Sequence, residues 1–330
     1  MKKHLLKKIG YYYRRERTDL LSSLGLPPHK LHKAVQQRIL LYHGIDELGR
    51  TDINARFLSV EKFEQQLDYY LKHFHIVSLQ AFQQGKFSTQ RPTVALTFDD
   101  GYKNNIDLAI PILERKGIPA TFFVTAIDSL PYPMLWTDYL DLANLLLRDT
   151  VRIDGQDFHW LKGEFSAENG RSLKAICKEQ AWAFKKQLYH IFPHLERRPD
   201  VLELKPYWQP MSSTDIQTIS EHPLFEIGVH AYYHEDLANC PVQEARHLLR
   251  QAKAYIESVC GKPINTLAYA NGSYTTALLD EAEAMGFEYQ LAVDYQHSED
   301  KTDPRINDRL TINPFVSIHN QVRAIYTNRY

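Results

Sequence analysis

Two stretches of the sequence place potential metal ligands directly after short apolar runs. One run ends in Asp99 and Asp100, and another ends in His230, with His234 four residues further on. Two imidazole nitrogens and one carboxylate oxygen are enough to bind a divalent metal and leave a position open for water. Each motif alone has an ordinary alternative, because Asp-Asp-Gly is a common turn and the chain contains 15 histidines. Their occurrence together predicts a composite site.

The geometry of strands and turns suits these residues to separate roles. Successive side chains of a strand point to opposite sides, so Asp99 and Asp100 can do different work. Adjacent carboxylates repel each other unless a cation or a proton compensates. If one helical turn follows the second apolar run, His230 and His234 face the same side.

Around these motifs the sequence alternates between strand-like runs and amphipathic helical segments. Predicted strands cover residues 39–42, 75–79, 93–98, 120–125, 225–229, 266–270 and 287–293; predicted helices cover residues 60–71, 104–116, 242–260, 274–285 and 317–326. This alternation predicts an α/β fold with a parallel sheet. In such folds functional groups gather at the carboxyl ends of strands, where Asp99, Asp100, His230, His43 and Asn271 all lie.

The two motifs resemble those of the polysaccharide deacetylase family, the carbohydrate esterases with a NodB-homology domain. Further similarity lies in residues 39–45, 119–124 and 267–274, so the resemblance covers roughly residues 38 to 326. It implies a distorted (β/α)7-type barrel. It also implies a hydrolase that removes N-acetyl groups from an amino sugar or from a polysaccharide or glycolipid precursor.

Position by position, the resemblance implies that Asp100, His230 and His234 bind the metal and that Asp99 is the general base. Zinc suits these ligands, and Co²⁺, Ni²⁺ and Mn²⁺ bind similar sites. The metal would polarise the amide carbonyl and activate a water. A backbone N–H at Asn271, in the third motif, would stabilise the tetrahedral oxyanion.

The sequence departs from the family pattern in two places. Ala268 and Ala270 stand where many members have an arginine and a proline. That arginine would orient the base, so we expect Asp99 to be held differently or to be a weaker base. A late Leu-x-His motif for the general acid is also missing, which leaves His43 and His319 as candidates; His319, at the start of a predicted helix, is the weaker one.

The alternation is interrupted between residue 128 and about residue 223. We predict a helix over residues 136–147, a hairpin over 151–160, further helix within 166–191 and an irregular segment over 193–210. This mainly helical insertion would lie over the carboxyl edge of the sheet and shape the substrate cleft. Trp136 and Asp138, together with Tyr269 and Tyr274 of the third motif, are the predicted substrate contacts. The alternative is a small packing subdomain without substrate contact.

Residues 1–37 form a basic segment that precedes the barrel domain of residues 38–330. Lysine and arginine dominate the first 17 residues, in which Glu16 is the one acid, and leucine, isoleucine and tyrosine are interleaved. Such a helix could associate weakly with an anionic membrane surface. The alternative is a helix that packs its Leu/Tyr side onto the barrel.

Composition sets further limits. A net charge of −1 argues against a nucleic-acid partner, and 44% apolar residues suffice for a large core. Three cysteines without CxxC spacing indicate a reducing compartment. We find neither a secretory signal nor an apolar run of about 20 residues. We therefore expect a cytoplasmic protein, peripheral at the inner face of the membrane if the basic segment binds there.

Two other functions fit the same residues. The metal site could serve another amide, as in a deformylase or a ring amidohydrolase. The degenerate third motif and the missing acid also fit a non-catalytic, metal-containing carbohydrate-binding protein, although such a protein has no need of a free Asp99.

Overall fold

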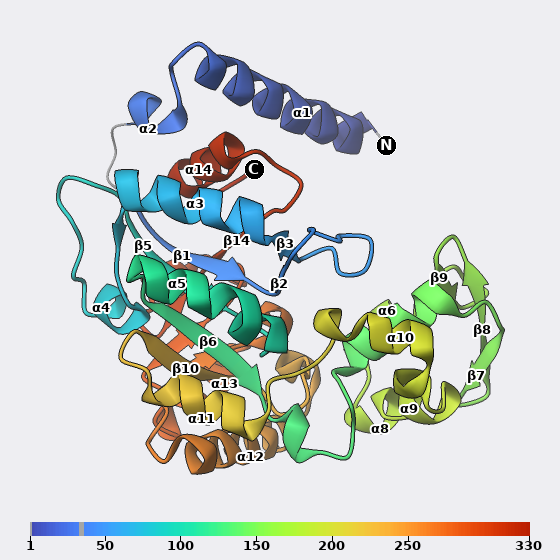
Figure 1. The fold of residues 1–330 in the computed structure, drawn as a ribbon. Helices are drawn as coiled ribbons and strands as arrows, with labels where there is room; N and C mark the ends of the chain where they lie inside the picture. Colours follow the sequence, from blue (N-terminus) through green and yellow to red (C-terminus); the bar gives the residue numbers. More distant parts are fainter. Residues whose placement is uncertain (1, 33–35) are drawn as a thin grey trace.

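The computed structural model describes residues 2–32 and 36–330. Its centre is a curled sheet in which all neighbouring strands run parallel, in the order β13-β12-β11-β10-β6-β5-β1-β14, with β4 paired to β5 (Figure 1). The strands are β1 Gln37–Tyr42, β4 His75–Ile76, β5 Thr93–Phe98, β6 Ala120–Thr125, β10 Phe225–Ala231, β11 Thr266–Ala268, β12 Tyr289–Leu291, β13 Ile306–Asn307 and β14 Leu310–Thr311. Every residue of β5 and β6 is buried, as expected for a parallel sheet covered on both faces.

The two ends of the sheet meet at one place in the chain. β13 pairs with β12 and β14 pairs with β1, and only Asp308 and Arg309 separate β13 from β14. The two short strands therefore act as one closing strand. Counted in this way, the strand positions are β1, β5, β6, β10, β11, β12 and β13/β14, which confirms the predicted distorted (β/α)7-type barrel.

Helices surround the sheet, and local sequence signals mark some of their ends. The Ser59 hydroxyl accepts a hydrogen bond from the Lys62 N–H at the start of α3, and Gly117 ends α5 with a φ of 65°. The surrounding helices are α3 Val60–His73, α4 Leu79–Gln83, the π-helix η1 Asn105–Ala109, α5 Ile110–Lys116, α11 Ser213–Glu221, α12 Val242–Cys260, α13 Thr276–Ala284 and α14 Ile318–Thr327.

The strand predicted over residues 75–79 is wrong in its second half. β4 ends at Ile76, and the Ser78 hydroxyl then accepts a hydrogen bond from the Ala81 N–H, which starts α4. A capping side chain outweighs the β propensity of the preceding residues here.

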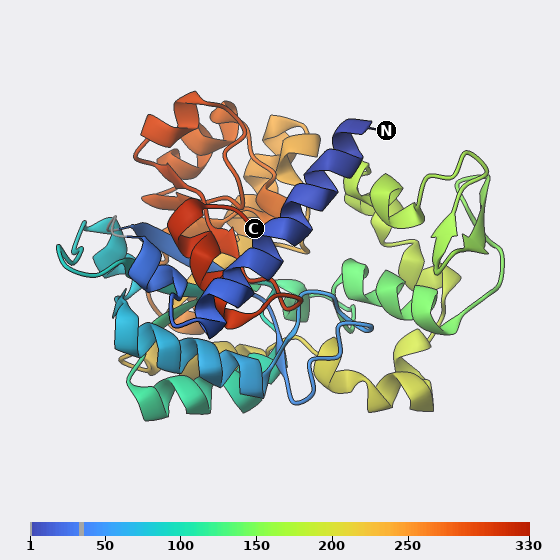
Figure 2. The same cartoon turned by 90° about the horizontal axis from the view of Figure 1, so that it is seen from above.

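The insertion forms a subdomain with its own core, standing to one side of the barrel (Figures 1 and 2). It contains α6 Trp136–Leu146, the hairpin strands β7 Val151–Ile153 and β8 Gln156–Leu161, β9 Glu164–Ser166, and the short helices α7 Leu173–Glu179, α8 Trp182–Lys185, α9 Leu188–Ile191 and α10 Pro199–Glu203. Its apolar cluster extends from Met134 to Trp208. Because α11 packs on β10 and α12 of the barrel, the insertion is shorter than the predicted 128–223.

The basic N-terminal segment folds into α1 Lys2–Ser23 and α2 Pro28–Leu31, both of which contact α14 (Figure 2). The tyrosine side of α1 does not pack onto the barrel as one alternative predicted, because Tyr12 and Tyr13 are 48% and 66% exposed. None of the helices in the described residues combines the length and apolar character needed to cross a membrane.

Candidate metal centre

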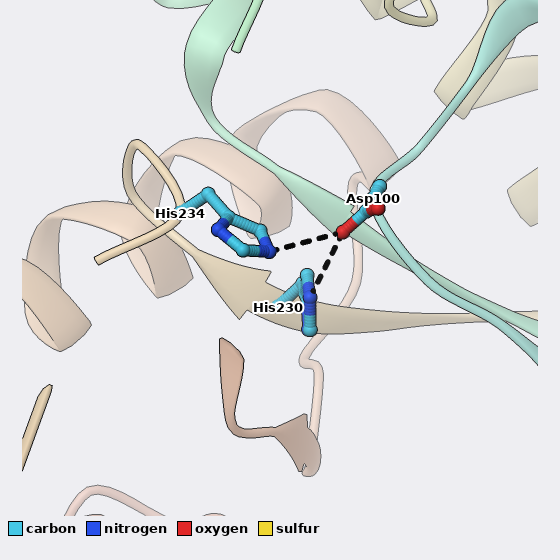
Figure 3. A group of neighbouring side chains, drawn as sticks. All are labelled: Asp100, His230 and His234. Atoms are coloured by element: carbon cyan, nitrogen blue, oxygen red, sulfur yellow. Dashed lines mark ion pairs between the residues drawn. The ribbon is translucent and has the colours of Figure 1, made fainter. Parts of the chain in front are cut away.

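Three buried side chains meet at the carboxyl end of the sheet. Oδ1 of Asp100 lies 3.2 Å from Nε2 of His230 and 3.2 Å from Nε2 of His234 (Figure 3). All three residues are 2% exposed, and one ligand atom from each lies within 4.8 Å of the others. The structure thus brings together the three residues that were predicted as metal ligands.

The surroundings of these side chains fit a divalent cation. Nδ1 of His230 lies 2.9 Å from the carbonyl oxygen of Ala268; that bond places the proton on Nδ1 and leaves the Nε2 lone pair facing Asp100. Both carboxylate oxygens of Asp100 are buried and have no hydrogen-bond partner among residues 2–32 and 36–330. A buried carboxylate in this state needs a positive partner, and Arg56, whose Nη1 is 3.5 Å from Oδ2, satisfies it only in part. Two imidazoles and a carboxylate suit zinc and other first-row metals.

Positive backbone φ angles orient two of the three side chains toward the cluster. Asp100, the second residue after the end of β5, has a φ of 73°, and His234 has a φ of 65°. The helical turn predicted between the histidines is wrong: His230 belongs to strand β10, and His234 follows in a loop. The Glu235 carboxylate shapes that loop by accepting hydrogen bonds from the backbone N–H groups of Tyr232 and Tyr233 at 3.0 and 2.8 Å.

Asp99 is fixed by an arginine that the sequence analysis did not identify. Nη1 and Nη2 of Arg309 donate to the two carboxylate oxygens of Asp99, each at 2.7 Å, and both side chains are almost fully buried. Burial alone would raise the pKa of Asp99, but Arg309 and His230 outweigh it and lower the pKa. Asp99 is therefore ionised, oriented and adjacent to the triad, with Oδ2 3.8 Å from Nε2 of His230.

Arg309 reaches Asp99 from the break in the closing strand. It directly precedes β14, and its Nε also donates to the carbonyl oxygen of Ala292 at 3.2 Å. The prediction that Asp99 is held differently from the family pattern is thus correct in geometry, since an arginine from a different strand replaces the one missing at Ala268. The only signal in the sequence is an arginine directly before the short run Leu-Thr-Ile at residues 310–312.

The two candidates for the general acid lie in different parts of the molecule. His43 is 9% exposed and interacts electrostatically with Asp99, Asp100 and Arg56. Burial, followed by Arg56, lowers the pKa of His43 to about 3, so its imidazole is neutral at pH 7. His319 is in α14, with its ring against Tyr69 near the end of α3, on the side of the sheet where the strands begin. The prediction of His319 as a site residue is therefore wrong.

Asn271 lies at the edge of the site, in the loop after β11, with a φ of 55°. Its side-chain Nδ2 donates to Asp236 Oδ1 at 3.1 Å, and its Oδ1 accepts from Nζ of Lys178 at 3.2 Å. Lys178 belongs to α7, so the inserted subdomain contacts the third motif directly. A Cβ on neighbouring Gly272 would lie 3.0 Å from the Val293 nitrogen, and its φ is 65°, which explains the glycine.

The predicted contacts of Tyr269 and Tyr274 with substrate are not supported. Tyr269 is fully buried, and its hydroxyl faces Gln290 and the carbonyl oxygen of Leu278. Tyr274 is 3% exposed, and its hydroxyl donates to Asp300. Both tyrosines support the loop from the core side.

Trp136 and Asp138 lie behind the ligands and are shielded from solvent. Nε1 of Trp136 donates to the carbonyl oxygen of His234 at 3.1 Å, and the Tyr102 hydroxyl donates to Asp138 Oδ1 at 2.9 Å. Burial raises the pKa of Asp138 to about 8. Being 0% and 3% exposed, Trp136 and Asp138 can position the site, which differs from the predicted role in direct substrate contact.

The fold and the site together define an α/β barrel with a buried Asp-His-His cluster and an oriented carboxylate beside it. The family model for polysaccharide deacetylase matches residues 86–141 and 204–290, so the unmatched residues 142–203 fall within the inserted subdomain. The chain belongs to the polysaccharide deacetylase family, whose members are hydrolases acting on amide C–N bonds.

Solved structures share this fold at low sequence identity. A polysaccharide deacetylase from Bacillus cereus is 15% identical, with a TM-score of 0.55 over 88% of this chain and 69% of its own. The deacetylase PplD from Streptococcus pyogenes, solved with acetate, is 16% identical, with a TM-score of 0.54 over 88% and 98% of the two chains. IcaB from Ammonifex degensii is 18% identical, with a TM-score of 0.54 over 89% and 98%. No curated protein matches the chain.

Proposed function

We propose that this protein is a metal-dependent hydrolase that removes N-acetyl groups from an amino sugar within a polysaccharide or its precursor. The observation that supports this most strongly is the buried cluster of Asp100, His230 and His234 beside a separate carboxylate, Asp99, that is oriented by Arg309. A protein that only binds metal and glycan gains nothing from fixing a charged Asp99 next to the ligands.

In this proposal Asp100, His230 and His234 bind the metal, most favourably Zn²⁺, with Co²⁺, Ni²⁺ and Mn²⁺ as alternatives. When bound, the metal would supply a Lewis acid for the amide carbonyl and a lowered pKa for water. The carbonyl of Ala268 keeps His230 in the tautomer that exposes Nε2.

Asp99 acts as the general base: it accepts a proton from the attacking water. Arg309 keeps the Asp99 carboxylate in place during this step. The C–N bond then breaks, and the departing sugar amine needs a proton. We assign delivery of that proton to His43, the buried imidazole within electrostatic reach of Asp99 and Asp100. Neutral at rest, His43 takes up the proton that Asp99 removed from the water and passes it to the amine. The backbone N–H at Asn271 is the proposed donor to the oxyanion.

The test compares N-acetylated and N-formylated amino sugars as substrates of the wild type and of Asp99→Asn. The proposal predicts acetate release that Asp99→Asn reduces by about 10²–10⁴-fold, with bound metal retained. Formate release without acetate release would assign the site to a deformylase. Undiminished glycan binding with no release of either acid would identify a binding protein and overturn the proposal.

A further inference from the structure

A pocket of about 430 Å³ lies between α1, α2 and α14, away from the metal centre. Its lining is strongly basic and includes Arg14, Arg17, His32, Arg323 and Arg329. His32 stacks on Tyr326, which contacts Phe74 just before β4, so the pocket is on the side of the barrel where the strands begin. The triad is at the opposite edge, and the pocket therefore has no part in the proposed hydrolysis.

The side chains that line this pocket carry an excess of positive charge. Among the described residues that line it, none is acidic. Arg323 is only 9% exposed, and its Nε and Nη2 are buried without a hydrogen-bond partner in the described part of the chain. Nε of Arg14 is also buried without a hydrogen-bond partner in the described part of the chain, whereas its Nη2 donates to the backbone oxygen of Tyr330 at 3.2 Å. Burial, then Arg14 and Arg329, lower the pKa of Arg323, as expected for cations held together.

Unpaired guanidinium groups around a hollow are suited to an anion with several oxygens. A phosphate group can accept several N–H donors at once, and the planar fork of arginine matches its geometry. Leu21, Leu26 and Leu31 provide an apolar wall beside these donors. The pocket thus fits a molecule with a phosphate group attached to an apolar or glycerol portion.

The outer face of α1 indicates where such a molecule comes from. Ile9, Tyr13, Leu20 and Leu24 are 55%, 66%, 61% and 69% exposed. The spacing of Ile9, Tyr13 and Leu20 places them in one stripe along the helix, next to Arg17 at the edge of the pocket, and Leu24 follows directly after the helix ends. Exposed apolar residues beside basic ones are typical of a helix that lies in the interface of an anionic membrane.

We propose that α1, α2 and α14 form a binding site for the phosphate headgroup of an anionic lipid, with the stripe of α1 inserted into the membrane surface. The site brings the protein to the surface of a bilayer without spanning it. Its lipid ligand is independent of the acetylated substrate.

The test is co-sedimentation of the full chain with phosphatidylcholine vesicles, with and without phosphatidic acid. We expect binding to the anionic vesicles only. Arg17→Gln and Arg323→Gln should each weaken it by roughly five-fold, because each basic residue near the surface contributes about that factor. Arg250→Gln, at an exposed position on α12, is the matched control and should bind like the wild type. Leu20→Ser with Leu24→Ser should weaken binding while leaving the pocket intact.

Calorimetry with inorganic phosphate separates the sources of the anion. Binding of inorganic phosphate without any binding to vesicles would overturn the lipid assignment. Vesicle binding that Arg17→Gln leaves unchanged would also overturn it, since Arg17 borders the pocket and its replacement does not disturb the core. These outcomes do not depend on acetate release, so the two proposals fail independently.

Discussion

Replacing Arg309 with glutamine removes the two hydrogen bonds that orient the carboxylate of Asp99. Both bonds are 2.7 Å long, and the Arg309 side chain is 0% exposed and that of Asp99 3% exposed, so water cannot screen the pair. Removing one member of a buried pair leaves an uncompensated charge, which destabilises the folded protein by about 3–5 kcal/mol. A misplaced base lowers kcat further, by about 10²-fold.

The assay measures kcat, KM and the free energy of unfolding in urea for each variant. Arg309→Lys keeps the charge but cannot donate two parallel bonds, so we expect an intermediate kcat with KM unchanged. Arg305→Gln is the matched control, because Arg305 is close in sequence but pairs with Asp280 and Asp303 at the surface. It should change stability by less than about 1 kcal/mol and leave kcat unaltered.

A double variant tests the pairing itself. Asp99→Asn leaves Arg309 buried without its anion, so the combined Asp99→Asn and Arg309→Gln variant should lose less stability than the sum of the two single variants. If the double variant loses as much free energy of unfolding as the two single variants lose together, the pair does not interact. An unchanged kcat in a folded Arg309→Gln protein would refute the positioning role.

Three further variants probe the surroundings of the site and the packing of α2. Trp136→Phe removes the bond to the His234 carbonyl; we expect about ten-fold weaker metal binding in an equilibrium titration, and unchanged binding would contradict the positioning role. His43→Ala should lower kcat by about 10²-fold without changing KM, and an unaltered kcat would remove His43 from the mechanism. His73 stacks on His29, and burial followed by His29 lowers the pKa of His73 to about 4. The folded state therefore favours neutral His73, and the resulting stability is present above pH 6.5 and lost as the pH falls toward 4. Unfolding curves of His73→Gln should depend less on pH in that window than those of the wild type; parallel curves would contradict this.

The main elements of the barrel could be predicted because their signals are local. β5 and β6 are short apolar runs that are buried on both faces, and their predicted bounds agree with the structure. The capping serine of α3 and the terminal glycine of α5 also act within a few residues of the helix ends. The candidate ligands Asp100, His230 and His234 could be proposed from the sequence because they lie at or just beyond the ends of two such runs.

Arg309 could not be predicted because its role depends on closure of the whole barrel. β13 and β14 have two residues each, too few for a periodic pattern, and the pairing of Arg309 with Asp99 joins residues 210 apart in the sequence. Tyr269, Tyr274 and Trp136 were misjudged for a related reason. Proximity in sequence to the motifs does not show whether a side chain faces the cleft or the core.

The most direct test of the central claim is the metal content of the purified wild type and of His230→Ala, measured together with acetate release from N-acetylated amino sugars. We predict one metal ion per wild-type chain and acetate release, with both lost in the His230→Ala variant. A wild-type protein that releases acetate without stoichiometric metal, or a variant that keeps both, would contradict the assignment of Asp100, His230 and His234 as the catalytic metal site.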